Sequence, residues 1–192
     1  MEQARLFLAL DVDQPVRKRL IQAMQFLREA VPRARWCRED ALHLTLWFFG
    51  TLPLASVSII GAAVAPVAAE TTAFAYTLRG IGGFPSLERP RVLWAGVGDG
   101  AQEVKQLAAV VQSALQAQGF CSNEREFVPH VTLARINERR QVGVPTLQRV
   151  LPDFATRDFG NTAADRLVLY ASELRSDGPV YSVVDSWELE GA

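Results

Sequence analysis

No apolar run in this chain of 192 residues approaches the roughly 20 residues that a helix needs to cross a bilayer. The first residues, Met1 to Arg5, lead directly into a strand-like segment without the apolar core of a signal peptide. We therefore expect a cytoplasmic protein that has no membrane partner.

Cysteine is scarce, and neither sign of charge dominates. Cys37 and Cys121 lie far apart in the sequence and lack the dense spacing of a secreted disulfide framework, so buried or idle thiols are expected. The formal net charge of −1 argues against a protein that coats long nucleic acid, because such binding neutralises many phosphates and needs a basic surface. A single phosphate or an RNA end is compatible with this charge.

The chain is 49% apolar and 21% charged, which fits a globular domain with a substantial core. Hydrophobic periodicity predicts strands over 5–12, 41–49, 73–81, 91–97, 129–135, 166–172 and 180–188, and helices over 13–30, 54–70, 102–118 and 145–151. Residues 82–85 are expected to form a loop between two strands. The order favours an α+β fold with two pseudo-symmetric lobes, each an antiparallel sheet covered by helices on its outer side, with a central cleft between them. Residues 1–192 would form this single bilobal domain, as a monomer.

Histidine is scarce too, and both copies open the same pattern. His43 begins His-Leu-Thr-Leu and His130 begins His-Val-Thr-Leu, each inside a predicted strand. Because side chains alternate along a strand, each histidine shares a face with a threonine, Thr45 or Thr132, while the apolar residues of the motif point to the core. One motif is expected in each lobe, with the two facing each other across the cleft.

Two such pairs suit the cleavage of a phosphodiester. One imidazole takes a proton from the attacking water while the other protonates the departing oxygen, and the threonine hydroxyls hold non-bridging phosphate oxygens. Such chemistry requires neither a cofactor nor a metal ion, because positioning and hydrogen bonding supply the stabilisation. The two motifs are nearly symmetric, so the residues alone do not say which histidine is the acid.

The sequence resembles the two-histidine phosphoesterases, and within them the RNA 2',3'-cyclic phosphodiesterases, also known as 2'-5' RNA ligases. The resemblance covers nearly the whole chain. It rests on segments 43–50 and 130–135, which carry the two motifs, on Arg5-Leu-Phe-Leu-Ala-Leu, and on Gly83-Phe84-Pro85. It also includes Arg91-Val-Leu-Trp-Ala-Gly, Leu169-Tyr170-Ala171-Ser172 and Tyr181.

The resemblance implies hydrolysis of a terminal 2',3'-cyclic phosphate on RNA to a 2'-phosphate, with 2'-5' ligation as a reverse activity. RNA ends or short oligonucleotides are the implied partners, and no protein partner is implied. By motif position His43 would donate a proton to the leaving 3'-oxygen and His130 would activate water. Thr45, Thr132 and Arg135 would bind the phosphate, and Phe48 would stack on the terminal base.

Strict alternation is at odds with two of these implied roles, because it places Phe48 and Arg135 on the core side of their strands. Each needs a strand end or a twist to reach the substrate. Trp47 shares the face of His43 under strict alternation and is therefore an alternative stacking residue. Trp94 is expected to lie in the core.

Two other functions compete with this hypothesis. Cys37, His43, Cys121 and His130 supply the count for a zinc site, although structural zinc ligands usually come in close pairs such as Cys-x-x-Cys. A binding module that recognises a cyclic phosphate or nucleotide without turnover would use the same groups as the enzyme.

Overall fold

The computed structural model describes residues 2–121, 126–137, 144–175 and 178–192. These residues form an α+β fold with one antiparallel sheet of nine strands. The strands are β1 (Gln3–Asp11), β2 (Arg35–Trp36), β3 (His43–Pro53), β4 (Phe74–Phe84), β5 (Val92–Val97), β6 (His130–Arg135), β7 (Asp158–Ala164), β8 (Arg166–Arg175) and β9 (Gly178–Glu188). The helices are α1 (Gln14–Ala30), α2 (Ser56–Glu70), α3 (Ala101–Ala117) and α4 (Val144–Val150), with short 3₁₀ helices η1 (Glu39–Ala41) and η3 (Leu151–Phe154).

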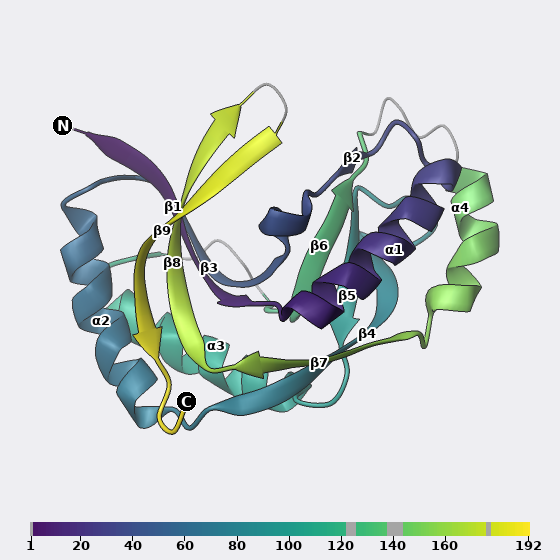
Figure 1. The fold of residues 1–192 in the computed structure, drawn as a ribbon. Helices are drawn as coiled ribbons and strands as arrows, with labels where there is room; N and C mark the ends of the chain where they lie inside the picture. Colours follow the sequence, from purple (N-terminus) through teal and green to yellow (C-terminus); the bar gives the residue numbers. More distant parts are fainter. Residues whose placement is uncertain (1, 122–125, 138–143, 176–177) are drawn as a thin grey trace.

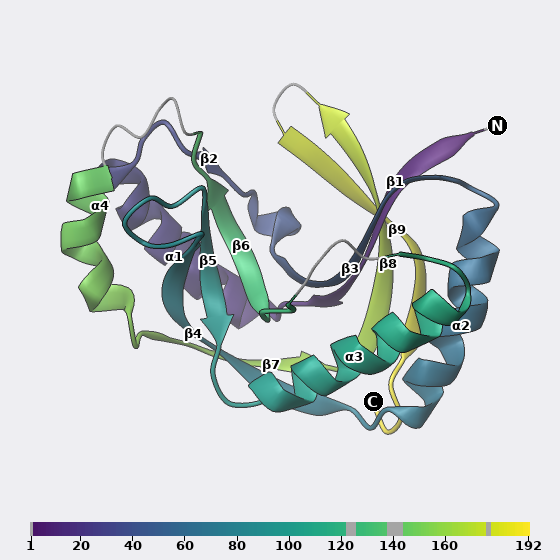
Figure 2. The ribbon, with the colours of Figure 1, turned by 180° about the vertical axis from the view of Figure 1, so that it is seen from behind.

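The sheet runs in the order β7-β4-β5-β6-β3-β1-β8-β9, with β2 added beside β6. It curls strongly, so that β4, β5 and β6 lie on one side of Figure 1 and β1, β8 and β9 on the other, as the reverse view in Figure 2 also shows. The predicted α+β class is confirmed. The two expected sheets are halves of one sheet, because β3 and β6 pair with each other.

The join between the halves is narrow. Leu44 of β3 faces Val131 of β6, and this is the single register pair between the two strands. Both side chains have no exposed surface and belong to the hydrophobic core. The middle of the sheet therefore depends on apolar packing at this point more than on a long hydrogen-bond ladder.

The order strand, helix, motif strand occurs twice along the chain. β1 is followed by α1 and pairs with β3, and β5 is followed by α3 and pairs with β6. The helices cross to the opposite half: α1 packs near β7 and α4, whereas α3 packs near β3 and α2. The two halves are therefore interlocked, and the expected repetition of strand, helix and motif strand is confirmed.

The helix α1 begins where its sequence predicts, with Pro15 in the first turn and a buried apolar face of Val16, Leu20, Met24 and Leu27. Asp13 occupies the cap position, but its carboxylate does not cap the helix. Instead it accepts a hydrogen bond from the backbone N–H of Ala163 at 3.1 Å. The cap residue thus ties α1 to β7.

Two segments differ from the prediction. The expected loop at 82–85 is the end of β4, because Gly82, Gly83 and Phe84 continue the ladder with β5. The strand β7 was not predicted, since its sequence, Asp-Phe-Gly-Asn-Thr-Ala-Ala, contains glycine and asparagine, which are uncommon in strands. None of the helices in the described ranges is long and apolar enough to cross a membrane.

Replacing Leu44 with alanine should lower the free energy of unfolding by about 2 to 5 kcal/mol, because it leaves a cavity where the two halves of the sheet join. Urea denaturation followed by circular dichroism measures the change. Val110→Ala is the control: this α3 side chain is exposed, and its loss should change stability by no more than about 0.5 kcal/mol. If Leu44→Ala lowers the free energy of unfolding by less than about 1 kcal/mol, the contact between the two halves of the sheet is not important for stability.

Candidate active site

The two histidine motifs meet at the join of the sheet. Because Leu44 and Val131 face each other in antiparallel strands and point into the core, the flanking residues of both strands point to the opposite face. That face carries His43 and Thr45 from β3, and His130 and Thr132 from β6; all four are half-buried. On this register the two histidines are diagonal neighbours. In a regular antiparallel pair the backbones of two such residues lie about 7–8 Å apart.

Phe48 and Arg135 reach the histidine face because both motif strands contain a bulge at the same place. Between β1 and β3 the register passes from Thr45 directly to Trp47, so Leu46 is an extra residue. Between β5 and β6 it passes from Thr132 directly to Ala134, so Leu133 is extra. Each bulge shifts the alternation by one residue, which brings Phe48 and Arg135 onto the exposed side. The strict alternation assumed from the sequence fails at this point.

Trp47 does not share the face of His43, and that expectation is wrong. In the bulge, Leu46 and Trp47 both turn toward the core opposite Leu8, and Trp47 is only 5% exposed. Its ring packs beside Phe49 inside the hydrophobic core. Phe48 is 46% exposed, and the guanidinium of Arg5 lies over its ring at 4.7 Å.

The ring of His130 is oriented by the backbone. Its Nδ1 lies 2.7 Å from the carbonyl oxygen of Val128, and since a carbonyl only accepts, Nδ1 carries the proton of this hydrogen bond. In the neutral ring the lone pair is then on Nε2, the atom that a general base uses. The ring of Phe84 packs edge-on against His130 with centroids 5.1 Å apart.

Trp94, which the sequence places in the core, lies instead on the face of His130. It pairs with Thr132 across β5 and β6, and its ring centroid is 6.1 Å from that of His130. Gly82 makes this position possible, because a Cβ at residue 82 would lie 2.2 Å from the Trp94 ring. The aromatic wall beside His130 therefore depends on a glycine of the neighbouring strand.

His43 lies among aromatic rings that the sequence analysis did not assign to the site. Phe7 stacks on it at 4.5 Å, and Tyr181 of β9 packs edge-on at 5.2 Å. Burial lowers the pKa of His43 to about 4, while the negative charge of Asp11 and a backbone hydrogen bond to Ala41 act in the opposite direction. His43 is therefore neutral at pH 7 in the free protein.

Two further groups act on His43. The positive charge of Arg17 lowers its pKa, and a proton on His130 would act in the same direction, so the protonation of the two histidines is linked. Each ring is also held by the backbone two residues before it: His43 by Ala41 and His130 by Val128. This repeated contact orients both imidazoles from rigid parts of the chain.

Asp11 lies directly opposite His43 in the pairing of β1 with β3. Its carboxylate accepts hydrogen bonds from the hydroxyl of Tyr170 at 2.5 Å and from Arg166 at 3.1 Å, and Arg17 lies 3.8 Å away. Burial, together with the contact to Asp11, raises the pKa of Tyr170, so that its hydroxyl is a neutral donor. A charged residue that ends the apolar strand Leu6 to Leu10 was the signal that could have identified Asp11.

The cysteines do not form a zinc site with the histidines. Among the residues that the structure describes, no three or more histidine, cysteine or acidic side chains are placed to share a metal ion. Burial raises the pKa of Cys37 to about 11, so its thiol is protonated at neutral pH, and Cys121 is exposed elsewhere.

The assembled site combines two oriented imidazoles with two threonine hydroxyls and one guanidinium. Its imidazoles can transfer protons at two positions, and its hydroxyls can donate hydrogen bonds to anionic oxygens. Aromatic rings border it on both sides, Phe7 and Tyr181 beside His43 and Phe84 and Trp94 beside His130. Such a site suits a phosphate ester that carries a planar base.

Comparison with known proteins identifies relatives over most of the chain. The family model of the 2'-5' RNA ligase superfamily matches residues 12–175. The RNA 2',3'-cyclic phosphodiesterase of Aquifex aeolicus (strain VF5) is 33% identical over 158 residues, which are 82% of each protein.

Solved structures show the same fold. A Thermus thermophilus protein matches with a TM-score of 0.79 at 29% identity, covering 97% of this chain and 98% of its own. The crystal structure of E. coli LigT complexed with ATP matches with a TM-score of 0.73 at 26% identity, covering 98% of this chain and 99% of its own.

Substitution of Asp11 by asparagine should move the titration of His43 to lower pH. The wild-type ring should titrate near pH 4, and loss of the carboxylate removes a charge that favours the imidazolium form. NMR chemical shifts of the His43 ring, followed against pH, measure the midpoint.

Asp185→Asn is the matched control, because it removes the same charge from an exposed position on β9. It should leave the midpoint where it is in the wild type. An unchanged or higher midpoint in Asp11→Asn would show that Asp11 does not stabilise the protonated ring.

Proposed function

The chain belongs to the 2'-5' RNA ligase superfamily, and we propose that it is an RNA 2',3'-cyclic phosphodiesterase. The observation that carries the proposal is the meeting of His43, Thr45, His130 and Thr132 on one face at the join of β3 and β6. The relative from Aquifex aeolicus has this activity in its name, and its similarity extends over most of the chain.

In the proposed reaction, water attacks the phosphorus of the cyclic phosphate while the bond to the 3'-oxygen breaks. His130 accepts the proton of the water at Nε2, because Nδ1 is occupied by Val128. His43 gives a proton to the departing 3'-oxygen. The product carries a 2'-phosphate and a free 3'-hydroxyl, and Thr45 and Thr132 hold the non-bridging oxygens.

The low pKa of His43 requires that substrate binding charge this ring. An anionic phosphate beside His43 favours the imidazolium form, and Asp11 acts in the same direction. Proton uptake would therefore accompany binding, and the acid would be in place only when a substrate occupies the site. Arg135 adds positive charge for the phosphate from the exposed side of β6.

The same site can run the reaction with a different nucleophile. A 5'-hydroxyl of a second RNA in place of water would form a 2'-5' linkage and release the same 3'-oxygen, so we include reversible 2'-5' ligation in the proposal. The scheme uses only side chains of the protein for proton transfer. Because both halves supply catalytic groups, we propose that residues 1–192 act as one bilobal unit, with the RNA end held between its pseudo-symmetric halves.

Wild-type protein should convert an oligonucleotide ending in a 2',3'-cyclic phosphate into a 2'-phosphate product, which phosphorus NMR identifies. His43→Ala and His130→Ala should each lower kcat by about 10² to 10⁴-fold, since each removes one general acid or base. The control Cys121→Ala changes an exposed side chain outside the site and should retain full turnover.

Three outcomes would contradict parts of this proposal. Wild-type turnover in either histidine variant would mean that the acid and base are misassigned. A 3'-phosphate product would show that the 2'-oxygen leaves. Binding of the oligonucleotide without any turnover would favour the alternative of a recognition module.

We further propose that Phe48 stacks on the terminal base. Its ring is exposed, whereas that of Trp47 is buried. Phe48→Ala should therefore raise KM by roughly tenfold with little change in kcat, in line with the usual strength of base stacking. Steady-state kinetics on the same oligonucleotide test this. Phe26→Ala is the control for loss of an exposed aromatic ring on α1 and should leave KM unchanged.

A further inference from the structure

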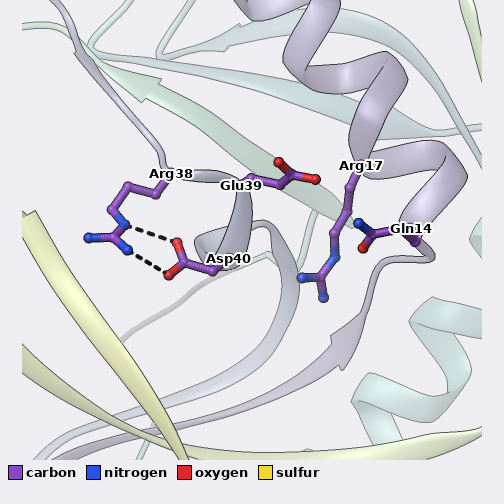
Figure 3. A pocket seen from close by; sticks show the side chains of 5 residues that line it. All are labelled: Gln14, Arg17, Arg38, Glu39 and Asp40. Atoms are coloured by element: carbon purple, nitrogen blue, oxygen red, sulfur yellow. Dashed lines mark hydrogen bonds and ion pairs between the residues drawn. The ribbon is translucent and has the colours of Figure 1, made fainter.

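A pocket of about 430 Å³ lies between the first turns of α1 and the 3₁₀ helix η1. Its lining residues come from these two elements and the residue before η1: Gln14, Arg17, Arg38, Glu39 and Asp40. Figure 3 shows Gln14 and Arg17 on α1, on the side to which Glu39 of η1 points, while the paired side chains of Arg38 and Asp40 point away from α1. The residues proposed to hold the phosphate and the terminal base do not line this pocket.

The pocket adjoins the site of His43, because Arg17, which lines it, lies 3.8 Å from Asp11, the residue opposite His43 in the pairing of β1 with β3. The helix η1 ends at Ala41, two residues before His43 and at the residue that holds its ring. Arg17 lines the pocket and also acts electrostatically on His43. Asp40, on the other wall, acts electrostatically on Tyr181, whose ring packs edge-on against His43. The pocket therefore lies on the His43 side of the site.

The lining has the chemistry of a nucleoside site. Two guanidiniums and an amide supply donors, while two carboxylates and the amide oxygen supply acceptors, so the formal charges of the lining balance. This balance disfavours a bare anion and suits a base or ribose, whose edges both donate and accept. Guanidinium planes are also common stacking surfaces for unpaired RNA bases.

Both guanidiniums are held in fixed orientations. Arg17 donates from Nε to the carbonyl oxygen of Val12 at 2.6 Å. Arg38 donates two parallel hydrogen bonds to the carboxylate of Asp40, at 3.0 and 2.9 Å. A volume of about 430 Å³ lies within the usual range of small-molecule pockets and accommodates one nucleotide unit.

We infer that this pocket binds the penultimate nucleotide of the RNA, so that substrates of two or more nucleotides are preferred over a cyclic mononucleotide. The inference rests on the proposed function, which also indicates the side on which the RNA leaves the site. During hydrolysis, the bond between phosphorus and the 3'-oxygen of the terminal ribose breaks. The 5'-oxygen of the same ribose is joined to the rest of the RNA. Because that 3'-oxygen departs beside His43, the preceding nucleotide leaves the site on the same side, where the pocket lies.

The test compares a 2',3'-cyclic mononucleotide with the dinucleotide that ends in the same cyclic nucleotide. For the wild type, the second nucleotide should lower KM by about tenfold and leave kcat unchanged, as expected when binding gains one hydrogen bond to a charged group. Arg38→Ala should raise KM for the dinucleotide by most of that factor and leave the kinetics of the mononucleotide unchanged. Gln14→Ala, from the opposite wall, should act in the same direction.

Arg149→Ala is the matched control, because it removes the same charge from an exposed position on α4. It should change KM and kcat for neither substrate at equal ionic strength. Unfolding curves should show that all three variants keep their fold. Equal KM values for the two substrates in the wild type would overturn the inference. An equal rise in KM for both substrates in Arg38→Ala would overturn it as well. Absence of hydrolysis with either substrate would instead contradict the proposed function itself.

Discussion

The contact between Leu44 and Val131 is the constraint on which the rest of the molecule depends. It is the only register pair between β3 and β6 among the described residues, and it lies in the middle of both histidine motifs. Because apolar burial fixes which way these two side chains point, it also fixes that the neighbouring histidines and threonines share the opposite face. One packing contact thus determines both the closure of the core and the assembly of the site.

The two bulges extend this arrangement beyond the motifs. Each motif strand carries one extra residue directly after its threonine, so that two consecutive side chains turn into the core and the next one turns out. The bulges place an aromatic ring, Phe48, in one half and a cation, Arg135, in the other. The halves are therefore alike in geometry and different in chemistry.

Electrostatics makes a second difference between the halves. His43 is enclosed by aromatic rings, and this burial lowers its pKa, while the carboxylate of Asp11, held by Tyr170 and Arg166, partly offsets the effect. The hydrogen bond from His130 to Val128 places the proton of the neutral ring on Nδ1, so that the lone pair of that form is on Nε2. Nearly identical motifs acquire different protonation behaviour from their surroundings.

Three features could be predicted from local sequence patterns: the α+β class, the order of strand, helix and motif strand, and the pairs His43 with Thr45 and His130 with Thr132. All three depend on periodicity within a few residues. The shared sheet of the two lobes, and the burial of Trp47 beside an exposed Phe48, became visible only in the folded chain. The same holds for the contact of Asp11 with His43. Bulges and cross-strand neighbours depend on which strands pair and in what register, and no local pattern records that pairing.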